Sequence, residues 1–301
     1  MDNNRLLTEA LRLAPAHRSL ADVGRAVNAA HNLDLTDAAW RGIFARNAER
    51  RDEVLSVLGN GSVSDGRSVR IYGDNVVAVL SDAHAPYMDQ HAIDAACEVI
   101  AHEKPSIVIL NGDMIDFYAL SRYDKQPDRV LELQEELDSC IGQVLRPLRQ
   151  AAQHAEMYYI NGNHEERLTR YVHAHPEISG LKALSLPSLL RLSEFSIEHV
   201  DYSIELNESA IITHGRTVRK WAGRSVHGEL ERIRYGASVV MGHVHRLARI
   251  VTRTRCGSVW GIEAGCLCSL TPEYDPAPDW AHGMAIVEST AAGTVGREVV
   301  L

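Results

Sequence analysis

Long apolar segments and paired cysteines are both missing from this chain of 301 residues. Apolar runs such as residues 107–110 are far shorter than the roughly 20 residues that a membrane span needs. Five cysteines occur and none forms a C-x-x-C pair, which excludes a disulfide framework and a cysteine-rich zinc site. The first residues are polar and charged, so we expect no secretory signal. A reducing, cytoplasmic compartment and no membrane partner are therefore expected.

Internal repeats and low-complexity segments are also missing. Hydrophobic residues make up 45% of the chain and charged residues 24%, which is ordinary for a globular protein. This composition excludes a disordered tail, a collagen-like fibre and a coiled-coil rod. The length suits one large domain with a small appendage, and nothing in the sequence sets the oligomeric state.

Charge is unevenly distributed. The net charge of −9 argues against a general nucleic-acid coat protein. Residues 214–255 nevertheless hold ten Lys and Arg against two acidic residues. This basic island is either a solvated surface or a patch that attracts an anionic substrate, and its place beside the motifs described below favours the patch.

The first 58 residues predict an all-helical appendage. Leu6, Leu7 and Ala10 recur at helical spacing, and Ser19 and Thr36 are candidate N-caps for a second and a third helix. A cluster of Gly, Ser, Asn and Asp follows. We therefore expect a helical domain at 1–58, a linker at 59–69 and a main domain at 70–301.

Short apolar strands alternate with helices in the main domain. The helices are expected at 89–101, 128–153 (kinked or split at Pro147) and 164–174. The strands are expected at 76–80, 107–110, 156–160, 210–213, 238–241, 247–252, 259–264 and 284–287. The pattern predicts an α/β (α+β) fold, a sandwich of two β-sheets flanked by helices.

Five of these strands end in polar residues of one kind. The segments that follow them are Ser-Asp82-Ala-His84, Asn-Gly-Asp113-Met-Ile-Asp116, Asn-Gly-Asn163-His164-Glu165, His214-Gly, and Gly-His243-Val-His245. Ligands of open α/β sheets bind beyond the carboxyl ends of the strands. We therefore expect these side chains to meet at one rim.

Carboxylate, imidazole and amide groups together form a set of metal ligands. They suit Mn, Fe, Zn, Ni or Mg rather than thiophilic ions. The glycines before Asp113, Asn163 and His243 are expected to let the backbone turn tightly. Each motif alone is weak evidence, whereas the ordered series is specific.

The series resembles the calcineurin-like metallophosphoesterases over residues 76 to about 250. The resemblance implies a sandwich with two divalent metal ions at its rim, Mn²⁺ first among the candidates. Asp82, His84 and His245 would hold one ion, and Asp113 would bridge to the second. The remaining ligands of the second ion would be Asn163, His214 and His243.

The resemblance also implies a mechanism. A hydroxide that bridges the two metals would attack phosphorus, and His164 would act as the general acid for the leaving oxygen. Asp113 and His164 are thus the expected catalytic residues. Asp116 and Glu165 are interpreted as groups that orient the ligands.

The sequence departs from one branch of the family. Protein phosphatases of the family carry Arg-Gly directly after Gly-Asp-x-x-Asp, where this chain has Phe117 and Tyr118. The departure favours the diesterase and nuclease branches. Several segments, among them Gly-Asn-His-Glu-Glu-Arg, are also similar to phosphoesterases from bacteriophage and prophage genomes.

A phosphodiesterase acting on nucleic acid is the leading hypothesis, with DNA as the expected substrate and partner. Two alternatives are a small-substrate phosphodiesterase or phosphatase, for instance one for cyclic nucleotides, and a DNA-binding regulator with a structural metal site. Residues 19–28 and 36–50 would form a helix-turn-helix if the appendage binds DNA, and otherwise a bundle for packing or assembly. The residues expected to hold substrate come from the basic island and are Arg216, Arg219, Lys220 and Trp221.

Overall fold

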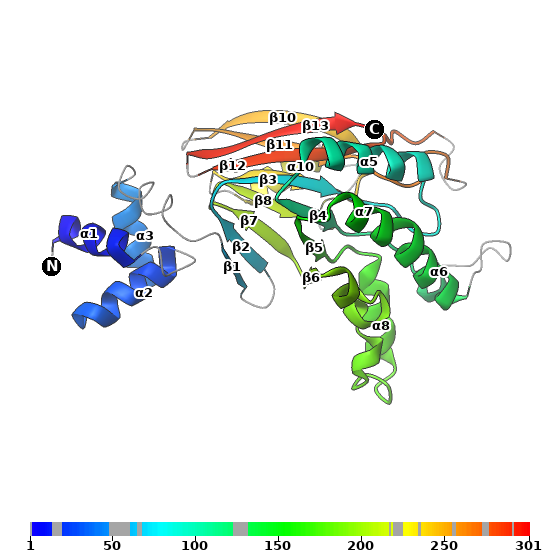
Figure 1. Cartoon of the computed structure of the whole chain (residues 1–301), viewed down its shortest axis with the longest axis horizontal. Helices are drawn as coiled ribbons and strands as arrows, with labels where there is room; N and C mark the ends of the chain where they lie inside the picture. The colour runs from blue at the N-terminus through cyan, green and yellow to red at the C-terminus, as the bar shows by residue number, and fades with distance from the viewer. Residues whose placement is uncertain are drawn as a thin grey trace.

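A computed structural model gives the architecture of the chain (Figure 1). The described residues are 2–13, 20–47, 61–64, 68–122, 132–216, 218, 225–233, 236–254, 257–272, 277–290 and 292–301.

Two mixed β-sheets form the body of the molecule, as the sequence predicts. The seven-stranded sheet has the order β1-β2-β7-β8-β9-β11-β10, and the six-stranded sheet has the order β13-β12-β3-β4-β5-β6. The strands of the first sheet are β1 (Gly61–Ser64), β2 (Ser68–Tyr72), β7 (Ser203–Leu206), β8 (Ala210–Thr213), β9 (Ser238–Met241), β10 (Leu247–Thr254) and β11 (Gly257–Ala264). Those of the second are β3 (Asn75–Leu80), β4 (Ile107–Asn111), β5 (Glu156–Ile160), β6 (Ile197–Val200), β12 (Gly283–Thr290) and β13 (Gly293–Val300).

Parallel pairing brings several strand ends to the same level. β3, β4 and β5 are neighbours that pair in parallel, and β8 and β9 do the same in the other sheet. Leu80 pairs with Leu110, and Thr213 pairs with Met241. The loops that follow these five strands therefore leave the sandwich at one edge.

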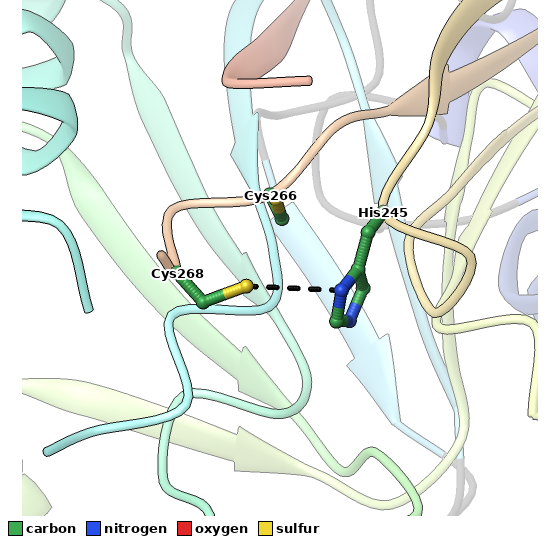
Figure 2. Close-up of side chains that lie close together, drawn as sticks. All are labelled: His245, Cys266 and Cys268. Carbon is green, nitrogen blue, oxygen red and sulfur yellow. Dashed lines mark hydrogen bonds between the residues drawn. The ribbon is translucent and has the colours of Figure 1, made fainter. Parts of the chain in front are cut away.

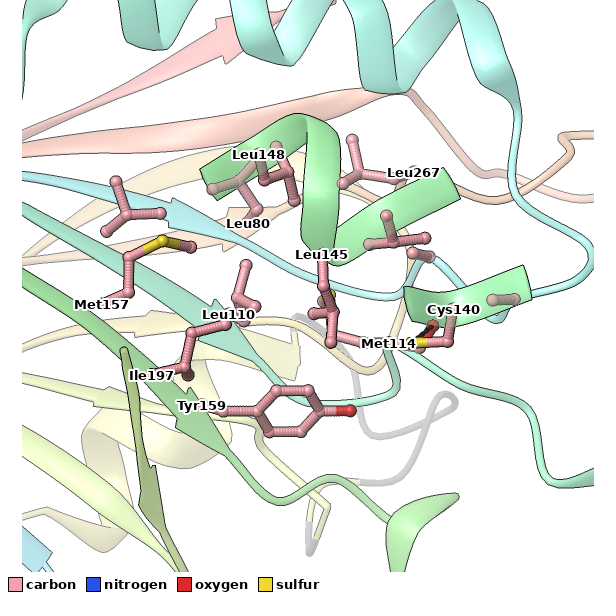
Figure 3. Packing of buried hydrophobic residues seen from close by; sticks show 14 of the residues in the cluster. Leu80, Leu110, Met114, Cys140, Leu145, Leu148, Met157, Tyr159, Ile197 and Leu267 are labelled. Atoms are coloured by element: carbon pink, nitrogen blue, oxygen red, sulfur yellow. Dashed lines mark hydrogen bonds between the residues drawn. The ribbon is translucent and has the colours of Figure 1, made fainter. Parts of the chain in front are cut away.

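The period of two along each strand separates two cores. Val77 and Val79 of β3 point into the space between the sheets. Ala78 and Leu80 point instead to the outer face of the six-stranded sheet, which the helices cover. Figure 3 shows this second core, in which Leu145 and Leu148 lie over the strands. Both faces of the central strands are buried, which explains their unbroken apolar sequence.

Helices α5 (Gln90–Glu103), α6 (Leu133–Ser139) and α7 (Arg146–Ala151) cover that face. A π-helical segment, Cys140–Leu145, joins α6 to α7 without a break. Pro147 lies at the start of α7, so the π-helical turn directly before it splits the long helix where the sequence predicts a kink or split. The predicted helix start at 128 lies outside the described residues.

Three smaller helical features complete the body. Helix α8 (Glu165–Ala174) begins directly after His164, and α9 (Leu186–Leu189) is a single turn. Helix α10 (Ser225–Arg232) packs on the other sheet, where Val226 and Leu230 contact the cluster around Val239. Short 3₁₀ turns lie at Tyr118–Leu120, Lys182–Leu184 and Leu192–Phe195.

The N-terminal appendage is helical, as the sequence predicts. Its helices are α1 (Asn3–Leu13), α2 (Leu20–His31) and α3 (Asp37–Arg46). Thr36 caps α3 by accepting a hydrogen bond from the Ala39 N–H at 3.2 Å. Trp40, Ile43 and Phe44 are buried in a cluster that also includes Tyr72, the last residue of β2. The candidate N-cap Ser19 lies outside the described residues.

The segment 59–69, predicted as a linker, contains a strand. β1 pairs antiparallel with β2 from Gly61–Tyr72 to Ser64–Val69, so part of this segment belongs to the seven-stranded sheet. Its Gly- and Ser-rich sequence lacks the apolar alternation that indicates a strand. The sheet order, rather than local sequence, accounts for this element.

Candidate metal centre

The five strand-end loops bring all seven predicted metal ligands together. Asp82 and His84 follow β3, Asp113 follows β4 and Asn163 follows β5. His214 follows β8, and His243 and His245 follow β9. The site therefore lies where the two sheets meet.

Asp82, His84 and His245 form the first group, and their ligand atoms lie within 4.8 Å of one another. Asp82 Oδ1 is 3.1 Å from His245 Nε2 and 3.7 Å from His84 Nε2. The two Nε2 atoms are themselves 3.1 Å apart. All three side chains are buried, so the nitrogen and oxygen atoms that face one another have little access to water.

Asp113, His214 and His243 form the second group, also within 4.8 Å. His214 Nε2 is 3.2 Å from Asp113 Oδ2 and 3.2 Å from Asn163 Oδ1. His214 Nδ1 lies 2.7 Å from the Asn111 carbonyl oxygen, which can only accept a hydrogen bond. Nδ1 therefore carries a proton, and Nε2 is the ring nitrogen that faces the group.

The Asp113 carboxylate lies between the two groups. Its Oδ1 accepts a hydrogen bond from the His164 backbone N–H at 2.8 Å. Its Oδ2 is 3.2 Å from His214 Nε2 and 3.9 Å from His84 Nε2. One oxygen is thus fixed by the backbone, while the other faces an imidazole of each group. This is the position that a bridging carboxylate requires.

The backbone is strained at five of the seven residues. Positive φ angles occur at non-glycine positions: Asp82 (58°), His84 (50°), Asp113 (53°), His243 (71°) and His245 (61°). Each such residue costs about 1–3 kcal/mol and persists only when its surroundings fix it. Here the loops are fixed to each other, since the Asp82 N–H bonds the Gly112 carbonyl and the His84 N–H bonds the Asp113 carbonyl.

The glycines before the ligands act differently from the prediction. Only Gly112 has a positive φ, of 83°, and so serves as a turn residue. A Cβ at Gly162 would lie 2.1 Å from Asp113 Oδ1, and a Cβ at Gly242 would lie 2.5 Å from Asp82 Oδ2. At Gly162 the reason for glycine is thus the close approach of the Asp113 carboxylate, and at Gly242 it is the close approach of both the Ser81 hydroxyl, at 1.8 Å, and the Asp82 carboxylate.

Electrostatic coupling ties the protonation of these groups together. Burial alone would raise the pKa of Asp82 and Asp113, but the histidines around them lower both pKa values well below the ordinary range. Burial would lower the pKa of His214, whereas Asp113 raises it to about 9. Against the same effect of burial, Asp116 and Asp82 raise the pKa of His84 well above its usual range. Protons on these imidazoles therefore balance the carboxylates.

The residues present fit divalent cations. Asp82 Oδ1 is buried and, although His245 Nε2 lies 3.1 Å away, it has no well-aligned hydrogen bond among the described residues. A buried carboxylate oxygen that lacks a hydrogen bond costs free energy unless a cation compensates its charge. A bound cation displaces protons from its ligands. The raised pKa values of His214 and His84 are therefore consistent with a cation site at these two residues. The carboxylates of the site thus require positive charge, which protons on the histidines provide when no metal ion is bound.

His164, Asp116 and Arg167 form a network beside the two groups. His164 Nδ1 lies 2.9 Å from the Asp116 carbonyl oxygen, so Nδ1 donates and Nε2 faces the site, 3.9 Å from Asp113 Oδ2. Arg167 donates to the Asp116 carboxylate at 2.8 Å and lies 3.2 Å from His164 Nε2. Arg167 was not among the predicted site residues, although it stands in the Gly-Asn-His-Glu-Glu-Arg segment, three residues after His164 on the same helix face.

Glu165 holds the loops rather than facing the site. Its buried carboxylate accepts the N–H groups of Asp113 and Met114 at 3.0 Å and of Gly162 at 2.8 Å. It also accepts the Tyr159 hydroxyl at 2.6 Å. Burial and, second, the charge of Asp113 raise the pKa of Glu165. These contacts fit the orienting role that the sequence predicts.

Cys266 and Cys268 lie directly behind His245. Figure 2 shows Cys268 directed at the imidazole, with Sγ 3.7 Å from His245 Nδ1 and Cys266 beside it. Both cysteines are buried and follow the end of β11. The contact with Cys266, and then burial, raise the pKa of Cys268 well above its usual range. The Cys268 thiol therefore stays protonated, and its contact with Nδ1 helps to orient the His245 ring.

Of the predicted substrate residues, only Arg216 lies among the described residues. It pairs with Glu166, and its guanidinium lies over the Tyr202 ring at 5.3 Å. These contacts hold Arg216 beside the loop of His214. Arg219, Lys220 and Trp221 lie outside the described residues.

Residues 76–247, more than half of the chain, match the sequence pattern of the calcineurin-like phosphoesterases. The chain belongs to this family. Calcineurin-like phosphoesterases are metal-dependent, and the two ligand groups lie within the matched segment. The resemblance drawn from the strand-end motifs is confirmed.

Two mycobacteriophage proteins are similar to this calcineurin-like phosphoesterase. It is 24% identical over 227 residues to the Gene 54 protein of Mycobacterium phage L5, covering 70% of this chain and 88% of that protein. It is also 24% identical over 178 residues to the Gene 54 protein of Mycobacterium phage D29, covering 56% and 69%. The predicted similarity to phage proteins is thus confirmed.

Solved structures with a similar fold include Vps29 of Entamoeba histolytica complexed with zinc and nuclease MPE of Pseudomonas putida. The first has a TM-score of 0.38 and 12% identity and covers 75% of this chain and 98% of that one. The second has a TM-score of 0.36 and 14% identity and covers 73% and 84%. In the part of the chain that the structure describes, no helix is long and apolar enough to cross a membrane.

Proposed function

We propose that this calcineurin-like phosphoesterase is a phosphodiesterase that holds two divalent ions and cleaves nucleic acid. Mn²⁺ is the first candidate for these ions. The observation that carries the proposal is the place of Asp113 Oδ2 between two groups of ligand atoms. Asp82, His84 and His245 would hold one ion, and Asn163, His214 and His243 the other. Such a pair of ions, when bound, activates water and stabilises the charge of a phosphoryl group during displacement.

The chain's own residues supply the proton for the leaving oxygen. His164 Nδ1 is fixed by the Asp116 carbonyl, which directs Nε2 toward the space beside Asp113. With Nδ1 donating, Nε2 accepts from Arg167 at 3.2 Å, so His164 would bind a proton at Nε2 in place of this contact and then pass it to the departing alkoxide. Asp116, which contacts both His164 and Arg167, keeps the ring in this orientation.

The residues after Asp116 support a diester rather than a monoester. Phe117 is fully buried, and the N–H groups of Tyr118 and Ala119 are bound by Glu136 at 2.9 and 2.7 Å. Phe117 and Tyr118, which stand where the protein phosphatases carry Arg-Gly, therefore present no cation to a phosphate dianion. A diester carries a single negative charge and needs less neutralisation, which is consistent with the site.

Parallel hydrolysis assays test the proposal. The Mn²⁺-loaded protein would be given bis-p-nitrophenyl phosphate, p-nitrophenyl phosphate, a 2′,3′-cyclic nucleotide, and labelled single- and double-stranded DNA. We expect diester and DNA cleavage to exceed monoester hydrolysis, and both Asp113→Ala and His164→Ala to lose DNA cleavage.

Matched controls are Asp94→Ala on the exposed face of α5 and His102→Ala near its end, which should keep full activity. Turnover of the cyclic nucleotide with intact DNA would replace the nuclease proposal by a small-substrate phosphodiesterase. DNA binding that survives Asp113→Ala, with no hydrolysis of any ester by the wild type, would favour the regulator.

A further inference from the structure

A cavity of about 350 Å³ opens beside the metal centre. Its lining residues come from the turn after β4 and from α8, and they are Leu120, Ser121, Arg122, Asn163, Arg167, Arg170 and Tyr171. We name this space the arginine cavity. Three guanidinium groups and two hydroxyls line it, and no carboxylate belongs to its described lining.

The arginine cavity adjoins the site through direct contacts. Arg170 donates to the backbone carbonyl of Asn163 at 3.4 Å, and Asn163 is a proposed ligand. Arg167 lies 3.2 Å from His164 Nε2, the atom proposed to hold the transferred proton. The cavity and the proposed metal centre therefore share Asn163 and touch through Arg167 and His164.

Neighbouring acids leave the cavity positive. The Asp116 carboxylate takes up part of the charge of Arg167 at 2.8 Å. Glu166, the next acid on α8, pairs with Arg216 instead. Arg170 is exposed and belongs to the lining of the cavity. The wall therefore offers a guanidinium group to an anion that arrives from solvent.

We infer that the arginine cavity binds the phosphate adjacent to the scissile one in a polynucleotide. The inference rests on the proposed function and names where its substrate extends. Guanidinium groups match phosphate geometry through paired N–H donors, and a cavity without carboxylates does not repel the anion. Tyr171, which is 43% exposed at the cavity, offers a ring on which a base can stack.

A kinetic comparison isolates the second phosphate. The substrates are TpT, which has one phosphate, and pTpT and TpTp, which each add one phosphate on opposite sides. For the wild type, either pTpT or TpTp should exceed TpT in kcat/KM by about tenfold, the usual scale of one charge-assisted contact. Arg170→Gln should remove most of this gain. The control is Arg297→Gln, which removes an arginine of β13 that pairs with Glu103 of α5. This variant should retain the gain from the second phosphate.

A binding measurement gives an independent readout without metal or turnover. Fluorescence anisotropy of labelled (dT)₁₀ would be followed in EDTA across a salt series. Arg170→Gln should weaken binding by about tenfold and reduce the salt slope by about one. Arg122→Gln combined with Arg170→Gln should weaken it further.

The outcomes separate the two proposals. A second phosphate that gives no gain, or a gain and an affinity that survive Arg170→Gln, would overturn the arginine cavity while leaving the phosphodiesterase intact. Failure of the wild type to cleave TpT or bis-p-nitrophenyl phosphate, with DNA binding still dependent on Arg170, would overturn the hydrolase and keep the cavity as an anion site.

Discussion

The hydrogen bond from His164 Nδ1 to the Asp116 carbonyl fixes which ring nitrogen can deliver a proton. We predict that His164→Gln lowers kcat by roughly 10²–10⁴-fold on a dinucleotide, whose alkoxide leaving group needs that proton. The loss on bis-p-nitrophenyl phosphate should be much smaller, because p-nitrophenolate leaves without protonation. Steady-state kinetics on both substrates measure the difference.

His102→Gln is the control for this prediction, since the His102 side chain is 85% exposed and far from the site along α5. Equal losses on both substrates would show that His164 shapes the site instead of donating a proton.

Gly162 is the second position where one residue decides the geometry. A Cβ there would press on Asp113 Oδ1 at 2.1 Å and on the Asp113 backbone nitrogen at 2.6 Å. We predict that Gly162→Ala displaces the carboxylate and lowers hydrolysis by about a hundredfold, the effect of a displacement near 1 Å. Gly180→Ala, where an added Cβ has nothing within 4 Å, should keep wild-type activity and a wild-type circular dichroism spectrum. Normal activity in Gly162→Ala would refute the close-approach explanation.

At the scale of elements, the strand ends were predictable because each central strand is apolar on both faces and stops at a polar residue. β5, β8 and β9 have the predicted bounds, and β3 and β4 differ by one residue. β1, β2, β6, β7 and β13 were not predicted. Their sequences are short or mixed in polarity, and their pairing depends on partners far along the chain.

The contact between α2 and α3 is a further testable element. The Trp40 indole N–H donates to Asn28 Oδ1 at 3.0 Å, and the Asn28 amide donates to the Leu35 carbonyl at 2.7 Å. Asn28→Ala leaves the buried Trp40 N–H without this acceptor, which should destabilise the appendage by about 1–3 kcal/mol. Hydrogen exchange of the full chain should show faster exchange in 20–47 and unchanged exchange in β4. Faster exchange spread evenly over both regions would contradict a separate helical unit.

At the scale of the whole molecule, the sequence predicted which residues gather at the site but not which residues surround them. The seven ligand positions are recognisable because their order along the chain follows the order of strand ends. Arg167 and the arginine cavity were not, because they depend on how α8 lies against the turn after β4. The basic island led us to predict the substrate-binding residues within 214–255 instead. Arg216 of that island is paired with Glu166.

Stability against pH tests the electrostatics of the metal-free protein. His214 has an ordinary pKa of about 6.5 when unfolded and one of about 9 when folded, and the folded pKa of His84 is also raised. A group whose pKa is higher in the folded state stabilises the fold fully at a pH below its unfolded pKa. This stabilisation is lost as the pH rises through the folded pKa. In EDTA, the free energy of unfolding should therefore fall between pH 6.5 and 9.

Each proton that differs between the folded and unfolded states gives a slope of roughly 1.4 kcal/mol per pH unit. Urea titrations at several pH values measure the slope, and His214→Asn should make it shallower. A free energy that is constant or rises over this range would contradict the proposed coupling of His214 with Asp113.

Anomalous diffraction from a crystal soaked in Mn²⁺ tests the central claim most directly, that this rim holds two ions around Asp113. The account predicts two peaks about 3.5–4 Å apart, one beside Asp82, His84 and His245 and the other beside Asn163, His214 and His243. Both should adjoin Asp113 Oδ2. A single peak, or peaks away from these residues, would contradict the two-ion centre and the phosphodiesterase built on it.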